Sequence, residues 1–150
     1  YCVDNVMYAV PASVGDPEVL LDLDAEGMTA RFPSFLPGGD RLLFSIKPDG
    51  GQQAESRIAL YDFDSGEYRV LFQEEGYNPV YSGSGHILYT RSEVLMAVPF
   101  DLGSAGITGD PAPIMEEIST ESILGGRSFD IAGDGTAGLC TRPNNAGNNL

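Results

Sequence analysis

The sequence predicts an all-β protein built from repeated four-stranded antiparallel sheets, and three observations carry this prediction. A turn motif rich in Gly, Ser and Asp recurs along the chain. The segments that flank it are short apolar runs of Leu, Ile, Val, Tyr and Phe, which are typical of strands. Helical periodicity is almost absent, and the acidic segment 116–123 is the best candidate for a helical turn.

The turn motif occurs three times. The copies are PSFLPGGDRLLF at 33–44, NPVYSGSGHILY at 78–89 and RSFDIAGDGTAGLC at 127–140. Their aligned glycines, Gly39, Gly85 and Gly135, are 46 and then 50 residues apart. Glycine next to Asp or Ser suits a tight turn between two strands. A helix start is missing after each copy, so the motif lacks the context of a phosphate-binding loop.

A second pair of strands lies before the first turn motif and after each of the first two. The first strand of the pair reads VMYAVP at 6–11, RIALYD at 57–62 and VLMAVP at 94–99; the second reads EVLL at 18–21, YRVLF at 68–72 and APIM at 112–115. The repeating unit is therefore four strands, which we call A, B, C and D. The chain begins with strands C and D of one unit and ends with strands A and B of another.

The strands do not alternate between apolar and polar residues, which means that both faces of each sheet are covered. Repeated four-stranded sheets buried on both faces are typical of a β-propeller, whose blades pack between their neighbours. We therefore expect about three blade equivalents. These are a half-blade over 1–29, complete blades over 30–77 and 78–126, a half-blade over 127–143 and a tail over 144–150. The residues expected to be buried between blades are Phe35, Phe44, Leu60, Tyr81, Leu88 and Ala97.

The four segments PSFLPGGDRLLF, IALYDFDSGEYRVLF, NPVYSGSGHILYTR and VLMAVPFDL together resemble TolB-like propeller repeats, over about residues 6–140. The usual turn of that family reads Pro-x-Phe-Ser-Pro-Asp-Gly, whereas this chain has Leu-Pro-Gly-Gly, Ser-Gly-Ser-Gly and Ala-Gly-Asp-Gly. The resemblance implies a non-catalytic scaffold that binds proteins or ligands. Two alternatives stay open. One is a fragment or accessory domain of a larger enzyme, such as a bacterial serine/threonine kinase or a peptidase; the other is a small-ligand binder that uses the central channel.

Three blade equivalents are too few for a ring, which usually has about four to eight blades. The chain could be a fragment of a longer six-bladed protein, or two chains could close one six-bladed ring. We expect the second, a homodimer in which each half-blade is completed by the partner. The residues expected at this junction are Val6, Tyr8, Val10, Ile131 and Leu139. Cys2 and Cys140 are too few for a disulfide framework, and Cys140 is expected to be a packed thiol.

The net charge is −14, from 22 acidic and 8 basic residues. A field of this sign repels phosphate backbones and anionic lipids, so nucleic acid and anionic membranes are not expected partners. No apolar run approaches the roughly 18 residues of a membrane span. The cellular compartment is left open by the sequence.

The search for catalytic residues gives only weak candidates. His86 is the only histidine and stands two residues after Ser84, but no nucleophile elbow surrounds the pair. We expect His86 to open a strand at the rim of the blade. Acidic pairs occur at Asp22/Asp24, Asp62/Asp64, Glu74/Glu75 and Glu116/Glu117, where Asp commonly caps turns, and none matches a calcium loop. We therefore expect no catalytic residue, no metal, no cofactor and no enzymatic activity.

One column of the aligned repeats is a candidate binding site. Arg31, Tyr77 and Arg127 each stand eight residues before an aligned glycine, on strands that would line the channel of a propeller. Two arginines there could receive the carboxylate or another anionic group of a small ligand or of a protein. The alternative is that the arginines pair with local Asp or Glu side chains.

Overall fold

The structure is a computed structural model, and it describes residues 2–3, 5–10, 15–115, 129–131 and 137–139. Within these residues the chain is nearly all β, with two single turns of 3-10 helix, η1 (Asp24–Glu26) and η2 (Gln53–Glu55). The all-β prediction is confirmed. The predicted helical turn at 116–123 lies outside the described residues. No helix in the described part of the chain is long and apolar enough to cross a membrane.

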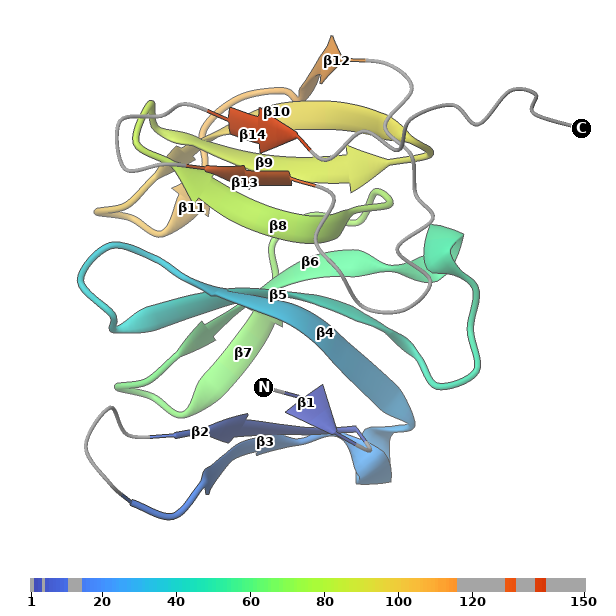
Figure 1. Cartoon of the computed structure of the whole chain (residues 1–150), viewed down its shortest axis with the longest axis vertical. Coiled ribbons are helices and arrows are strands. Elements are labelled where there is room, and N and C mark those ends of the chain that lie inside the picture. Colours follow the sequence, from blue (N-terminus) through green and yellow to red (C-terminus); the bar gives the residue numbers. More distant parts are fainter. Residues whose placement is uncertain (1, 4, 11–14, 116–128, 132–136, 140–150) are drawn as a thin grey trace, which may run out of the picture.

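The strands form successive antiparallel sheets (Figure 1). The first sheet contains β1 (Cys2–Val3), β2 (Val6–Ala9) and β3 (Glu18–Asp22). The second contains β4 (Met28–Phe35), β5 (Arg41–Pro48), β6 (Arg57–Asp62) and β7 (Glu67–Val70). The third contains β8 (Tyr77–Ser82), β9 (His86–Arg91) and β10 (Val94–Asp101), and both β11 (Gly106–Ile107) and β12 (Ala112–Met115) pair with β10. A hairpin of β13 (Phe129–Ile131) and β14 (Ala137–Leu139) follows.

The second sheet follows the predicted A–B–C–D order as β4, β5, β6 and β7. In the third sheet β8, β9, β10 and β12 follow this order, and the additional short strand β11 also pairs with β10. The first sheet differs from the predicted half-blade. It has a third strand, β1, which pairs with β2 through Cys2 opposite Met7. The short apolar pair at 2–3 was too brief to be recognised as a strand from its pattern.

The glycines of the repeated motif lie in strand-to-strand turns, as predicted. Gly38 and Gly39, between β4 and β5, have φ values of 95° and 72°, and Gly85, between β8 and β9, has a φ of 85°. An L side chain rarely adopts this left-handed conformation, so the turns favour glycine. Gly135, in the third copy, lies outside the described residues.

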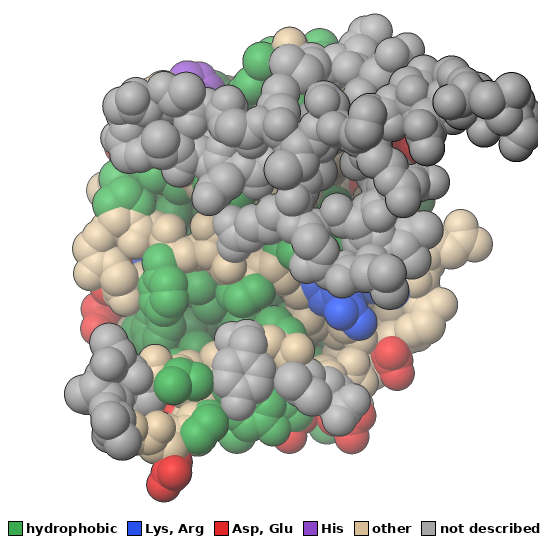
Figure 2. Space-filling view, in the orientation of Figure 1, with side chains coloured by type: hydrophobic (Ala, Val, Ile, Leu, Met, Phe, Trp, Pro, Cys, Tyr) green, Lys and Arg blue, Asp and Glu red, His purple; other side chains and the backbone are tan. Residues whose placement is uncertain are grey.

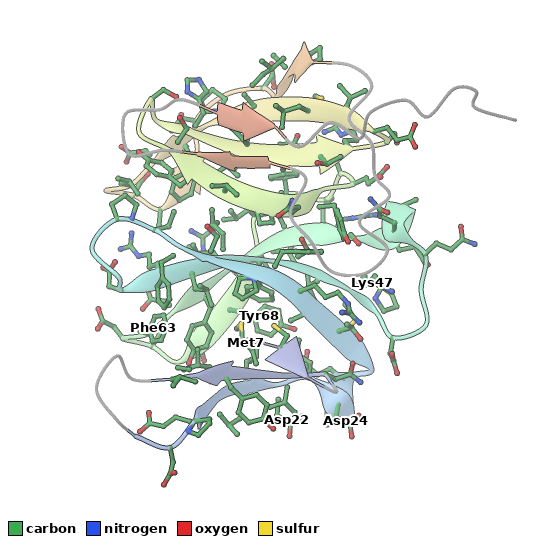
Figure 3. All side chains as sticks on the ribbon, in the orientation of Figure 1. Met7, Asp22, Asp24, Lys47, Phe63 and Tyr68 are labelled. Atoms are coloured by element: carbon green, nitrogen blue, oxygen red, sulfur yellow. The ribbon has the colours of Figure 1, made fainter. Side chains whose placement is uncertain are left out.

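The sheets stack face to face, with the second sheet between the first and the third (Figure 1). Along β5, Leu42 and Phe44 pack against the first sheet, whereas Leu43 packs against the third. Both faces of the second sheet are therefore covered, which explains the continuous apolar run. In the described residues the sheets form an open stack. Figure 3 shows Met7 and Tyr68 in the space between the first two sheets.

Most of the predicted core is buried, with one clear exception. Phe44, Leu60 and Leu88 are buried, and Tyr81 and Ala97 are half-buried. The prediction for Phe35 is wrong, because its side chain is 60% exposed. Phe35 is the last residue of β4, and its ring stacks on Phe63 instead of packing closely between the sheets.

Candidate functional site

Arg31 and Tyr77 occupy equivalent places on the first strands of neighbouring sheets. Each is followed by a residue in the left-handed region, Phe32 with φ 55° or Asn78 with φ 56°, and then by a proline. Pairing with the next strand shifts register at both places. A β-bulge changes the direction of the side chains around it, and left-handed residues other than glycine concentrate at functional sites. The column found by aligning the repeats is therefore a repeated bulge.

The bulges bring Arg31 and Tyr77 close together, because β4 and β8 lie side by side. The rings of Phe32 and Tyr77 meet edge to face, with centroids 4.8 Å apart. Burial raises the pKa of Tyr77, and the positive charge of Arg31 acts in the opposite direction. The third residue of the predicted column, Arg127, lies outside the described residues.

A pocket of about 340 Å³ lies beside Arg31, between the first and second sheets. Its lining residues are Cys2, Asn5, Asp24, Thr29, Ala30, Arg31 and Asp49. They come from three segments: the β1–β2 connection, the passage from η1 into β4, and the loop that follows β5. Thr29 and Ala30 are buried at its floor, while Asp24, Arg31 and Asp49 are exposed at its rim. In Figure 3, Asp24 marks this end of the first sheet.

Hydrogen bonds fix the polar side chains of the pocket. The hydroxyl of Thr29 donates to Asn5 Oδ1 at 2.5 Å and lies 3.4 Å from Asp49 Oδ1. The Asn5 side chain donates from Nδ2 to Asp24 Oδ1 at 3.5 Å. The backbone N–H of Asp49 donates to Gly27 O at 2.8 Å, which holds the loop after β5 against the start of β4. Contacts within the protein thus orient these oxygen-bearing side chains.

Arg31 is the one cation among the described residues that line the pocket. Its guanidinium forms no hydrogen bond or ion pair with another described residue, whereas Arg41 pairs with Asp62 at 3.7 Å. Pairing with local carboxylates therefore does not account for Arg31 in the described part of the chain. A planar guanidinium can donate two parallel hydrogen bonds to a carboxylate.

The thiol of Cys2 also faces this pocket. Burial raises the pKa of Cys2, and the charge of Arg31 opposes that change only in part. The thiol is therefore neutral at neutral pH, and a neutral thiol is a poor nucleophile. Cys2 contributes shape and polarity to the pocket rather than a reactive thiolate.

The other candidates from the sequence lie elsewhere. The turn before β9 brings Ser84 Oγ within 3.1 Å of His86 Nδ1, and His86 is the first residue of β9, as expected. No carboxylate among the described residues is hydrogen-bonded to His86, so the pair lacks the third group that orients a catalytic base. Asp62 accepts the backbone N–H groups of Asp64 and Ser65, which lower its pKa, so this acidic pair caps a turn. Within the described residues, no group of three His, Cys, Asp or Glu side chains could hold a metal ion.

Several pocket residues were not found from the sequence. Asp24 belonged to an acidic pair that was assigned to a turn, and Asp49 stands in a Pro-Asp-Gly-Gly loop that also resembles a turn. Asn5 and Thr29 belong to no motif that the sequence shows. Their common feature is a place at one end of two packed sheets, which only the three-dimensional arrangement provides.

Comparison with known proteins gives a likeness in fold. No protein-family model matches the sequence, and no curated protein matches it. A solved structure named luciferin-regenerating enzyme is similar, with a TM-score of 0.62 and 10% sequence identity. The match covers 91% of this chain and 48% of the other, so this chain spans about half the length of that neighbour. At this identity the likeness shows the all-β fold alone.

This likeness corrects one prediction. The sequence was expected to encode a protein without enzymatic activity, but a chain with a similar fold is named an enzyme. The expectation rested on the lack of a nucleophile elbow and of a calcium loop. The lack of these two motifs does not exclude catalysis, because proteins of one fold perform different chemistries at different sites.

Proposed function

We propose that this chain is a propeller-type binding protein, related to the TolB-like repeats, whose pocket at Arg31 holds a small polar ligand. The observation that supports the proposal is the meeting of two exposed carboxylates, Asp24 and Asp49, with a guanidinium that pairs with no described residue, around a pocket of about 340 Å³. This volume lies at the lower end of the range of about 300–1,000 Å³ for small-molecule sites. The ligand is therefore about the size of an amino acid.

The charges of the pocket indicate the chemical class of the ligand. A carboxylate on the ligand accepts two hydrogen bonds from Arg31. Asp24 and Asp49 accept hydrogen bonds from an ammonium or from hydroxyl groups. A simple dianion is disfavoured by these two carboxylates and by the net charge of −14. Amino acids and 2-hydroxy acids combine the required groups.

Arg31→Gln is expected to weaken binding of such a ligand by about tenfold or more, because hydrogen bonds to charged groups are among the stronger ones. The measurement is a calorimetric titration with amino acids and 2-hydroxy acids, beside simple amines and simple carboxylic acids that each lack one group. Arg69→Gln is the matched control, since Arg69 is exposed and donates to Ala105 O, away from this pocket. Equal binding by wild type and Arg31→Gln would contradict the proposal, as would a panel in which no compound binds.

The structural neighbour is named an enzyme, so a second version of the proposal is that the pocket at Arg31 converts its ligand chemically. The same ligands are followed by proton NMR for several hours in the presence of the protein. New ligand signals that are lost in Asp49→Asn would favour turnover at the pocket. Unchanged ligand signals, together with binding, would favour a binding protein.

We also propose that the described sheets are blades of a six-bladed ring that a second copy of the chain closes. Three strands that occupy position A, β4, β8 and β13, follow one another along one side of the stack, as they do around a channel. In the dimer, β13 and β14 of one copy would extend the first sheet of the other at the free edge formed by β1, because β1 already pairs with β2. The alternative is that further blades of a longer polypeptide close the ring.

Light scattering is expected to give twice the mass of the chain, 2 × 16.0 = 32.0 kDa. Val19→Glu should shift the protein toward the monomer, because Val19 is a 59% exposed apolar residue on β3, in the sheet placed at the junction. Ile114→Glu, on β12 of the third sheet, is the control and should leave the mass unchanged. A stable, well-behaved 16.0 kDa monomer would contradict closure by a second copy.

A further inference from the structure

A second cavity, of about 270 Å³, lies between the first and second sheets at the end of β4 away from Arg31. Every residue that lines it is apolar or aromatic; they include Met7, Tyr8, Val10, Leu20, Phe35 and Leu42. Figure 2 shows the corresponding hydrophobic surface between these sheets, hollowed and open on this face. We call this cavity the apolar groove. It shares no lining residue with the pocket at Arg31.

Two large apolar side chains of the groove are mostly exposed. Phe35 is 60% exposed and Val10 is 55% exposed, whereas Met7 and Leu42 are buried at the floor. Single exposed apolar residues are ordinary on protein surfaces, but apolar residues that gather around a hollow mark a binding site. The cavity volume equals that of about nine water molecules of about 30 Å³ each. A small flat molecule fits into this volume, and a folded domain does not.

The ring of Phe35 is held in place before any ligand binds. It stacks on Phe63 with centroids 5.8 Å apart and an angle of 16°, and Phe63 meets Tyr61 edge to face at 5.1 Å. Tyr61 is buried, so this row of rings is anchored in the core. Phe35 lines the groove and Phe63 does not. Phe35 therefore presents a fixed aromatic wall, which lowers the entropy cost of stacking a flat ligand on it.

The charged residues near the groove indicate which charge the ligand carries. Glu18 is paired with Ala9, a lining residue, across β2 and β3, and it is exposed. Asp64 follows Phe63, and the backbone N–H of Phe63 donates to the carbonyl of Asp40; both Asp64 and Asp40 are exposed. Arg41, the basic residue next to Asp40, is engaged by Asp62 and by the carbonyl of Leu102 in the third sheet. Glu18, Asp40 and Asp64 are not part of the lining, but they lie close to lining residues or to Phe63, and their negative charges favour a cation.

We propose that the apolar groove binds a small planar aromatic cation, with its ring stacked on Phe35 and its positive charge toward Glu18, Asp40 and Asp64. Stacking on Phe35 supplies the attraction of an aromatic pair, and the face of a phenyl ring also attracts cations. These acidic side chains raise the local concentration of cations and repel anions of the same shape. The site is independent of the proposed pocket at Arg31.

The test is a fluorescence titration of the intact protein with 9-aminoacridine, a planar cation, and with acridine-9-carboxylate, an anion with the same three rings. The cation is expected to bind once per chain, and the anion at least about tenfold more weakly. Phe35→Ala should weaken binding of the cation by about tenfold, whereas Phe35→Tyr, which keeps the ring, should bind like wild type. Glu18→Gln should weaken binding of the cation by about threefold, and this effect should be smaller at high salt.

Two control variants separate this site from others. Ile114→Ala removes an exposed apolar residue of the third sheet and should leave binding unchanged. Arg31→Gln should also leave binding of the cation unchanged. A negative result for the groove can therefore be told apart from a negative result for the proposed pocket at Arg31. Equal binding of the two dyes, or unchanged binding by Phe35→Ala, would overturn the proposal. Failure of wild type to bind, with a fall from dimer to monomer in Phe35→Ala, would identify a second copy of the chain as the occupant.

Discussion

Replacing Phe44 with alanine is expected to lower the free energy of unfolding by about 3–5 kcal/mol. Phe44 is fully buried on β5, between the first and second sheets, and its ring meets Tyr68 edge to face at 5.8 Å. The cavity would lie between two sheets whose backbones are held by hydrogen bonds, so the surroundings can close it only in part. Urea unfolding followed by circular dichroism measures the loss.

The control is the same substitution at Phe35, on the neighbouring strand of the same sheet. Because Phe35 is mostly exposed, Phe35→Ala should cost less than about 1 kcal/mol. Leu43→Ala tests the opposite face of β5 and should cost about 2–5 kcal/mol, since Leu43 is buried against the third sheet. A loss below about 1 kcal/mol at either Leu43 or Phe44 would mean that one face of β5 is not covered.

The fold could be predicted because its determinants are local. The glycines of each turn stand next to Asp or Ser, and each strand is a short apolar run, so both signals lie within a few neighbouring residues. On β5, Phe44 and Leu43 point into different interfaces, and this requires apolar residues at consecutive positions. That pattern can be recognised without knowing which sheet covers which face.

The error at Phe35 has a different origin. The exposure of Phe35 depends on where close packing between the first and second sheets ends, and at Phe35 an open groove separates them. No feature of the local sequence around Phe35 indicates where this limit lies. Sequence pattern identified Phe35 as the end of an apolar strand, and the packing against the neighbouring sheet decides whether its ring is covered.

The candidate pocket could be predicted only through Arg31. Arg31 was found because the repeats align, and alignment identifies residues that share a place in the repeating unit. Asn5, Thr29 and Asp49 come from different segments, and the packing of two sheets brings them together. Their residue types are common in turns, so nothing in the sequence separates them from ordinary turn residues.

Asn78→Val is expected to lower the free energy of unfolding by about 2–3 kcal/mol, because a β-branched residue is strained in the left-handed conformation. Asn78 has a φ of 56° in the bulge of β8, and its side chain is buried. Asn adopts this conformation more readily than most residues. The backbone N–H of Asn78 donates to Ser45 Oγ at 2.8 Å, which ties the bulge to β5 in the second sheet, so the backbone cannot easily relax.

Asn78→Gly separates the strain from the loss of the side chain. Glycine accepts a φ of 56° without strain, and the lost Oδ1 has no hydrogen-bond partner among the described residues. The glycine variant should therefore lose only about 1 kcal/mol, mainly through the greater freedom of its unfolded chain. Equal losses for valine and glycine, measured by urea unfolding, would mean that the bulge is not conformationally demanding. A larger loss for valine would establish that the left-handed residue before Pro79 is required, and Phe32 occupies the equivalent place directly after Arg31 at the candidate pocket.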